Sequence, residues 1–582
     1  MKYLLTILLL TLFSTSILSA LPSESNISDN NTSENNTTQQ EHNQTQKLFT
    51  KTFKRSPSKL LKTIPQKKFL INFYRKNSYL PLWIKEDKLD STNYTQLFEH
   101  IEEDITLDKQ GPIYKNYQML KKSLDNNLTQ EKLLHTEIKL SSLYYNFLLH
   151  TIYGEIQWKN FGYKLSSLKK RKINAAWIKR KPKFNLSKLM KRRDINQTIS
   201  DITPKRFGYQ GLLLSLKKLE AIKAKGGWEE LPYFKRLAIG SGGDIVLKLR
   251  ERLKASDDYR ECNETNNSLV VTQKTTHAKD LNLSRDAIFG HCLDDAVKIF
   301  QARHGLHVDG IVGRGTRKAL NTSLDEKIAK IRLNIDRIKW LPREEKARYL
   351  IVNIPEFMLH YIEAGKTKQN LAVITGDKKH PTPIFSENIS YVVLNPYWKI
   401  PEGIVRREMI PAMIKDPNYL KRQGIEAHRT WYENSRIMDT SSLYLEEYLY
   451  GNKKFPYRLM QPPGPKNALG KIKFKFPNRF SVYLHDTPTR YLFNRTVRAF
   501  SHGCVRLSKP RKLLETIATF NPDINITKAK EILKGKRKKQ LNLKEKLPIY
   551  IVYLTAGMNS SGRIEFRNDI YNYDKYQKRR LR

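Results

Sequence analysis

The chain has 582 residues, of which 39% are hydrophobic and 28% are charged, and its formal net charge is +48 at pH 7. This length is typical of about three or four domains with ordinary hydrophobic cores, so we predict a multidomain soluble protein. In a cytosolic protein such a charge would point first to nucleic acid, but the export signal at residues 1–20 excludes that partner. Because the lysines and arginines are dispersed along the chain, we interpret most of them as solvated surface; attraction to an anionic polymer or membrane is the weaker interpretation.

Residues 1–20 have the pattern of a secretory signal peptide. Lys2 is followed by an apolar run over residues 4–13 and by small residues that lead to Ala20. The run is short for a bilayer span, so we predict cleavage and export. Leu18 is unfavourable three positions before the expected break, which leaves an uncleaved membrane anchor as the alternative.

Residues 21–57 are rich in Asn, Ser and Thr and are predicted to be a disordered linker, because they hold too little apolar surface to fold. Within and beyond this segment, Asn recurs with an acidic residue two before it and Ser or Thr two after it. This pattern resembles the extended acceptor sequon of bacterial N-glycosylation systems, and chance matches in an Asn-rich chain are the alternative. The hypothesis places N-glycans on Asn26, Asn31, Asn36 and Asn43, and the pattern returns at Asn127, Asn196, Asn263, Asn266, Asn282 and Asn525.

Apolar residues at helical spacing run through residues 58–239, which are predicted to form a mostly helical scaffold domain. No catalytic constellation stands in this range, and we interpret its aromatic residues as core. Residues 325–345 return to helix and could rejoin the scaffold, which would make the segment between them an insertion.

Residues 240–324 are predicted to form a separate module of helices around a glycine-containing turn. An amphipathic helix over Asp244–Leu253 precedes a polar insertion, and further helices lead up to and follow the turn. The residues Phe300-Gln301, Gly305-Leu306, Asp309-Gly310 and Gly313 to Thr316 resemble a three-helix peptidoglycan-binding domain.

Cys262 and Cys292 flank the polar insertion of this module. In an oxidising compartment they could form a disulfide that stabilises the protein by about 3 kcal/mol, although the sequence does not establish their separation. Such a pairing would leave Cys504 as the odd thiol.

From residue 346 to 556 the hydrophobic period changes toward two, and a β-rich domain is predicted. Residues 401–470 interrupt it with a helical, proline-containing segment that we interpret as a lid beside the active site. A basic tail, residues 557–582, follows. Expected strands lie at residues 349–354, 357–362, 370–374, 389–394 and 480–484.

Cys504 lies in the run Ser501-His502-Gly503-Cys504, and His485 stands nineteen residues upstream. A catalytic thiol reacts as thiolate, so it needs an imidazole or another positive field to lower its pKa, and two histidines are near in sequence. Gly503 would let the backbone approach a substrate, and the N–H groups of Gly503 and Cys504 could stabilise an oxyanion. The alternative interpretation is a buried core thiol beside a turn histidine.

These residues resemble an L,D-transpeptidase with a YkuD-type catalytic domain, in particular the large YcbB-like members that carry a scaffold and a peptidoglycan-binding domain. The family motif is a histidine, a spacer of about fifteen residues, and then Ser/Thr-His-Gly-Cys. Further agreement comes from Pro381-Thr382-Pro383, Asn395-Pro396-Tyr397-Trp398, Pro462-Pro463-Gly464-Pro465, Asn467-Ala468-Leu469-Gly470 and Arg498-Ala499-Phe500. The implied fold is a multidomain α+β protein with a helical scaffold, a three-helix module and a mostly-β catalytic domain with a helical lid.

The resemblance implies a periplasmic, cell-wall-associated acyltransferase that joins peptidoglycan stem peptides through 3-3 cross-links by way of a cysteine thioester. Its partners would be stem peptides and glycan strands, and it would act in the organisation of the cell wall and in cell shape. Carbapenems would inhibit it by acylating Cys504. An L,D-carboxypeptidase that trims tetrapeptide stems and a non-catalytic peptidoglycan-binding scaffold are the alternatives.

The same resemblance assigns the site residues. Cys504 is the nucleophile and His485 its base, oriented by a group near Asp486 or by Thr487. His502 tunes the thiolate or braces the turn, and Arg506, where some relatives carry Asn, binds a substrate carboxylate or faces solvent. The remaining expected substrate-binding residues are Ser501, Asp486, Trp398 and Tyr397. No metal or organic cofactor is implied, because the thirteen histidines show no zinc-type spacing.

Overall fold

The computed structural model describes residues 47–577, apart from positions 56, 58–60, 63, 86, 125–127, 263–283, 345 and 452. The predicted signal peptide, the four sequons near the N-terminus and the sequons at Asn127, Asn263, Asn266 and Asn282 lie outside the described residues. The chain forms two compact units: Met1–Tyr94 with Ser123–Ser142, and Thr95–Lys122 with Leu143–Arg582. Within the described ranges, no helix combines the length and the apolar character needed to cross a membrane.

The prediction that residues 21–57 form a disordered linker is wrong at the C-terminal end of that segment, because residues 47–55 are helical. Phe49 and Phe53 stand four apart, so they share one face of this helix. Both are buried, and their rings lie 5.0 and 5.3 Å from the ring of Tyr74. The aromatic pair therefore supplies apolar surface that the composition of the whole segment conceals.

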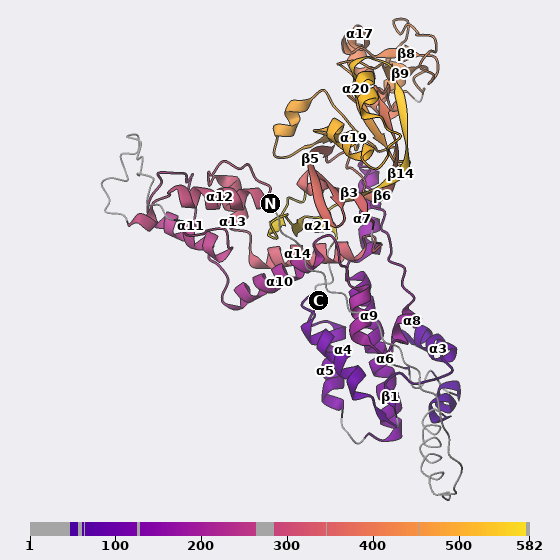
Figure 1. Cartoon of the computed structure of the whole chain (residues 1–582), viewed down its shortest axis with the longest axis vertical. Coiled ribbons are helices and arrows are strands. Elements are labelled where there is room, and N and C mark those ends of the chain that lie inside the picture. Colours follow the sequence, from indigo (N-terminus) through magenta and orange to yellow (C-terminus); the bar gives the residue numbers. More distant parts are fainter. Residues whose placement is uncertain are drawn as a thin grey trace, which may run out of the picture. The chain divides into compact units, whose positions relative to one another are not determined.

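Helices build the chain up to residue 339, as the hydrophobic spacing predicted (Figure 1). They are α3 (Lys67–Lys76), α4 (Ser91–Glu103), α5 (Pro112–Ser123), α6 (Gln130–Tyr153), α7 (Trp158–Lys170), α8 (Leu186–Met190), α9 (Ile195–Ile202), α10 (Tyr209–Ala224), α11 (Asp244–Ala255), α12 (His291–Arg303), α13 (Arg314–Leu320) and α14 (Leu324–Lys339), with a short hairpin of β1 (Ile84–Lys85) and β2 (Lys88–Leu89). In the second unit α10 packs along α14, and Leu212, Leu216, Ile331 and Ile335 share one core.

The module between α10 and α14 has its own core, which includes Val246, Val297 and Phe300. The side-chain amide of Gln301 donates to the carbonyl of Ile311 at 2.9 Å, and its oxygen accepts from the N–H of Gly310 at 3.0 Å. The residues that resemble a peptidoglycan-binding domain therefore build the turn of this module.

Cys262 and Cys292 form a disulfide, with their Cα atoms 6.0 Å apart. The bond ties the start of α12 to the segment after α11. Cys504 is left as a free cysteine.

Nine of the strands described after residue 347 form one sheet in the order β12-β5-β13-β11-β10-β6-β14-β3-β4, and β4 also pairs with β5 (Figure 1). The sheet thus curls back on itself around a core that includes Leu350, Val373, Leu394 and Leu484, and α19 (Pro510–Ala518) and α20 (Ile526–Lys534) pack on it. The strands are β3 (Arg348–Asn353), β4 (Met358–Glu363), β5 (Lys366–Gly376), β6 (Phe385–Leu394), β10 (Ile472–Lys475), β11 (Leu484–His485), β12 (Ala499–Ser501), β13 (Val505–Leu507) and β14 (Lys539–Val552).

The strand predicted at residues 480–484 is present only at its end, as part of β11. The side-chain oxygen of Asn478 accepts from the backbone N–H groups of Phe480 and Val482 at 3.0 and 3.1 Å. Such local side-chain bonds compete with strand pairing, so they hold these residues in a turn.

The predicted lid, residues 401–470, carries a core of its own that includes Val405, Met409 and Leu459. Besides helices it contains the strands β8 (Glu426–His428) and β9 (Arg458–Gln461); β9 lies between β8 and β7 (Trp398–Lys399), which precedes residue 401. Its helical elements are α15 (Glu402–Ile404), η3 (Val405–Met409), α16 (Ile410–Lys415), α17 (Tyr419–Gln423) and α18 (Glu446–Leu449). We call residues 401–470 the insertion below.

The predicted basic tail is folded over its described part. It forms the hairpin of β15 (Ala556–Met558) and β16 (Ile564–Phe566) and the short helix α21 (Tyr573–Tyr576). Ile570, Tyr571 and Tyr573 are buried in the same core as the large sheet.

We expect the Cys262–Cys292 disulfide to stabilise the module by about 3–4 kcal/mol, because it closes a loop of 30 residues in the unfolded chain. Hydrogen exchange of α12 in oxidised and reduced protein would measure the loss, in a Cys504→Ala background so that no third thiol takes part. Equal protection of α12 in the two forms would contradict the prediction.

Candidate active site

His485 and Cys504 come together because β11 and β13 are neighbouring parallel strands. Leu484 pairs with Val505 and His485 with Arg506, and the N–H of Val505 donates to the carbonyl of Tyr483 at 3.1 Å. Side chains alternate along a strand, so Cys504, two residues before Arg506, is on the same face of the sheet as His485. The strand register thus directs the two predicted site residues toward the same face, with His485 at the end of β11 and Cys504 directly before β13.

The turn before Cys504 is held by the side chain of Ser501. Its hydroxyl donates to the carbonyl of Cys504, and it accepts from the N–H of Gly503 at 3.2 Å. Gly503 has φ +105°, a conformation that side chains rarely adopt. Ser501 is buried and braces this turn, and the N–H of Gly503 is engaged with Ser501.

The tautomer of His485 follows from its contact with the backbone. Nδ1 lies 2.5 Å from the carbonyl oxygen of Asp486, and since a carbonyl only accepts, Nδ1 carries the proton. Burial, with Arg506 and Lys473 nearby, lowers the pKa of His485 to about 3. The ring is therefore neutral near pH 7, and its Nε2 is an acceptor.

The carboxylate of Asp486 is occupied within the fold. It accepts from the N–H of Lys471 at 2.9 Å and from Arg490 at 2.8 Å, and the residue is buried. A Cβ at Gly470, which has φ +59°, would lie 2.5 Å from this carboxylate. Asp486 thus contacts His485 through its backbone carbonyl, while its carboxylate binds Lys471 and Arg490.

Lys473 and Lys475 place positive charge near the Cys504 thiol. Desolvation raises the pKa of Cys504, and hydrogen bonds from Tyr483 together with the charges of Lys473 and Lys475 offset part of that rise. Lys473 pairs with His485 across β10 and β11, and its Nζ lies 3.9 Å from the centre of the Tyr483 ring. Burial, with Lys475 nearby, lowers the pKa of Lys473 to about 8.

These two lysines were missed in the sequence, although a signal was present. The run Lys471-Ile472-Lys473-Phe474-Lys475-Phe476 alternates lysine with apolar residues. Such alternation places the lysines on one face of a strand. Only the pairing of β10 with β11 shows that this face is the one that carries His485.

His502 connects the turn to the insertion. Its Nε2 lies 2.5 Å from Oε1 of Glu408 in η3, and its ring centre lies 4.7 Å from that of His380. The contact with His502 lowers the pKa of Glu408. His502 was expected either to tune the thiolate or to brace the turn, and this geometry favours bracing of the turn.

Arg506 is half-buried, and its guanidinium has spare hydrogen-bonding capacity. One nitrogen donates to Thr489 at 3.1 Å, while Nε is buried and has no partner among the described residues. A buried, unsatisfied donor fits anion binding better than the solvent-facing alternative.

Trp398 and Tyr397 are not brought to the thiol by any recorded contact within the described part of the chain. Trp398 lies in β7 and packs against the core of the insertion, with Tyr397 just before it. In the same part of the chain, no group of three or more His, Cys, Asp or Glu side chains is arranged to hold a metal ion.

Three family models match parts of the sequence. Residues 347–532 match the L,D-transpeptidase catalytic domain, residues 68–216 a scaffold domain, and residues 276–320 a domain described as "Putative peptidoglycan binding domain". A Haemophilus influenzae protein named "Putative L,D-transpeptidase" is 32% identical over 255 residues, which are 44% of this chain and 50% of that protein. This chain thus spans half the length of the curated relative.

Two solved L,D-transpeptidases are also similar. The structure from Xylanimonas cellulosilytica is 15% identical and covers 55% of this chain and 99% of its own, with a TM-score of 0.16. The structure from Stackebrandtia nassauensis is 14% identical and covers 54% of this chain and 94% of its own, with a TM-score of 0.20. We draw nothing about function from scores this low.

Below pH 8, where Lys473 with its pKa of about 8 is still charged, replacing Lys473 by Met should lower the thiolate fraction of Cys504 by about tenfold, as if the pKa of the thiol rose by about one pH unit, because a neighbouring positive charge is removed. The pH dependence of alkylation by iodoacetamide measures that pKa, since only the thiolate reacts. Lys475→Met is the matched control and should give a smaller rise, because its effect on the thiol is weaker. An unchanged profile in both variants would contradict the assignment.

The low pKa of His485 predicts that stability depends on pH. As the pH falls from 6.5 toward 3, the unfolded chain binds a proton at this residue and the folded chain does not, so folding is disfavoured. Relative to His485→Asn, the wild-type free energy of unfolding should fall by about 1.4 kcal/mol per pH unit over that window. Urea unfolding of both proteins measures the difference, and a constant difference across the window would sink the prediction.

Proposed function

We propose, from the L,D-transpeptidase catalytic domain that residues 347–532 form, that the protein is a cysteine-dependent acyltransferase that makes 3-3 cross-links between peptidoglycan stem peptides. The observation that supports the proposal is the parallel pairing of β11 with β13, in which His485 lies opposite Arg506, two residues after Cys504. A thiol next to a neutral imidazole is the arrangement that nucleophilic acyl transfer requires.

In the first step, the sulfur of Cys504 attacks the carbonyl carbon of the L,D peptide bond between the third residue of a donor stem and its terminal D-alanine. The thiol proton passes to Nε2 of His485 and then to the leaving amine, as the C–N bond breaks and a thioester forms. The N–H of Cys504 keeps its proposed role at the oxyanion.

In the second step, the side-chain amine of an acceptor stem attacks the thioester. The new C–N bond forms, the C–S bond breaks, and His485 takes the proton of the amine and returns it to sulfur. Water in the place of the amine would give trimmed stems, which is the carboxypeptidase alternative.

The pKa values decide the resting state of the pair. Burial lowers the pKa of His485 to about 3 and raises the pKa of Cys504, so moving the proton from sulfur to the imidazole in advance is strongly unfavourable. The pair therefore rests as neutral thiol and neutral imidazole, and the proton leaves as the sulfur attacks. Lys473 and Lys475 stabilise the charge that develops on the sulfur.

Arg506 is proposed to bind a substrate carboxylate, since its buried Nε needs an acceptor. The module that contains residues 276–320 is proposed to hold glycan strands or stems of the same polymer. Such substrates lie outside the cytoplasm, so we propose a periplasmic enzyme associated with the wall, active in wall organisation and cell shape and acylated by carbapenems at Cys504. Export by residues 1–20, retention as an anchor, and N-glycans on Asn26, Asn31, Asn36 and Asn43 are further proposals.

Purified tetrapeptide muropeptides provide the direct test. Wild-type protein should release D-alanine and form dimers, whereas Cys504→Ala should lose both products and the thioester adduct seen in intact mass. Cosedimentation of Cys504→Ala with cell-wall sacculi is the control that the variant is folded. Dimers made by Cys504→Ala would refute the nucleophile, and tripeptides without dimers would favour the carboxypeptidase.

A further inference from the structure

The hydroxyl of Tyr571 bridges two backbone groups at the end of β5. It donates to the carbonyl of Gly376 at 2.6 Å and accepts from the N–H of Thr382 at 3.2 Å. Burial raises the pKa of Tyr571 to about 12, so the hydroxyl keeps its proton and can donate. Tyr571, Gly376 and Thr382 are all buried, where each of these backbone groups needs a partner.

The same stretch of backbone holds both sides of the turn that precedes Cys504. The hydroxyl of Thr382 accepts from the N–H of Gly376 at 2.8 Å and donates to the carbonyl of Gly503 at 2.9 Å. The N–H of Asp377 donates to the carbonyl of Ser501 at 2.9 Å. An unbroken set of hydrogen bonds therefore runs from Tyr571 through Thr382 to the residue before the nucleophile.

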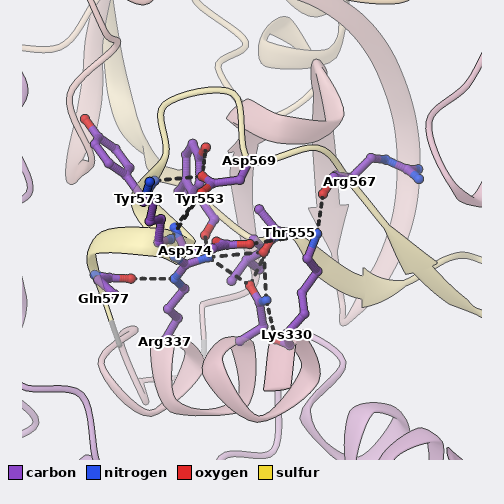
Figure 2. Close-up of polar contacts among 12 residues, drawn as sticks. Lys330, Arg337, Tyr553, Thr555, Arg567, Asp569, Tyr573, Asp574 and Gln577 are labelled. Carbon is purple, nitrogen blue, oxygen red and sulfur yellow. Dashed lines mark hydrogen bonds and ion pairs between the residues drawn. The ribbon is translucent and has the colours of Figure 1, made fainter. Parts of the chain in front are cut away.

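The segment that carries Tyr571 is itself anchored (Figure 2). The N–H of Tyr571 donates to the hydroxyl of Tyr553 at 2.9 Å, and that hydroxyl donates to Asp569 at 2.6 Å. Asp569 also accepts from the N–H of Tyr573 at 2.7 Å.

Helix α14 completes this anchor from the other side. Arg337 lies 2.8 Å from a carboxylate oxygen of Asp574, and its Nε donates to Gln577 at 2.7 Å (Figure 2). The end of β14 and α14 together fix the position of residues 569–577. Tyr571 is thus a rigid support for the loop and not the tip of a free tail.

We propose that Tyr571 is a positioning residue of the active site, which fixes the turn Ser501–Cys504 through Gly376 and Thr382. It lies beyond residues 347–532, so the catalytic-domain match does not contain it. The inference rests on the proposed function of Cys504 as nucleophile. In chemical terms, the orientation of the Cys504 thiol depends on the hydroxyl of Tyr571, which the C-terminal segment supplies.

Tyr571→Phe removes this hydroxyl and keeps the ring, which packs against Tyr553 and Tyr573. We expect kcat for dimer formation to fall about 10- to 100-fold with KM changed less than about threefold, because misplacement of a reacting group acts on the chemical step. Tyr573→Phe is the matched control: Tyr573 is a buried tyrosine of the same segment, and its hydroxyl has no hydrogen-bond partner among the described residues. It should leave kcat and KM unchanged.

A double-mutant cycle tests the path itself. Thr382→Val should lower kcat as Tyr571→Phe does, and the double variant should lose no more than the worse single variant, because both act through one set of bonds. The inference would be overturned if the fold-loss of kcat in the double variant equalled the product of the two single-variant losses. It would also be overturned if Tyr571→Phe kept the wild-type kcat.

Alkylation of Cys504 by iodoacetamide separates this inference from the proposed function, because it needs no stem peptide. If Tyr571 positions the turn, the rate of Cys504 alkylation at pH 7 should fall at least about twofold in Tyr571→Phe. In Tyr573→Phe the alkylation rate should stay unchanged. Wild-type protein that forms no dimers would refute the proposed function, while equal alkylation in the two variants and the wild type would refute the positioning role.

Discussion

The parallel pairing of β11 with β13 is the constraint on which the candidate site depends. Each strand is only two or three residues long, so few hydrogen bonds hold the pair, and the N–H of Val505 bound to the carbonyl of Tyr483 is one of them. A shift of one residue would turn His485 and Cys504 to opposite faces, because side chains alternate along a strand. The long strands on either side, such as β5 and β6, hold the short ones in register.

Burial of the catalytic pair has a cost that the neighbouring strand offsets. An enclosed imidazole is a weak base, and an enclosed thiol is a weak acid, since both charged forms lose solvation. Lys473 and Lys475 of β10 place positive charge near the sulfur. The site thereby favours negative charge on sulfur and disfavours positive charge on His485.

Two elements outside the sheet brace the turn that carries the nucleophile. Glu408 of the insertion contacts His502, and Tyr571 of the C-terminal segment supports the loop that binds Ser501 and Gly503. Hydrogen bonds within the turn occupy Ser501 and the N–H of Gly503, so the residues of the motif serve its shape as much as its chemistry. This division explains why residues that look like substrate ligands in the sequence are structural in the fold.

The sequence by itself determined the fold class and the strands β3, β4, β5 and β6, and it named His485 and Cys504 as candidates, because period, glycine turns and motif spacing are local; it did not reveal β10, β12, β13 or β14. It did not reveal the helix at residues 47–55, where two phenylalanines are hidden in a polar composition. It also missed Lys473, Lys475 and Tyr571, although the lysine alternation was visible. Only the tertiary structure decided which residues of the insertion and the C-terminal segment support the turn before Cys504, and that the lysines of β10 lie beside β11. Strand order and burial depend on contacts between residues far apart in the chain.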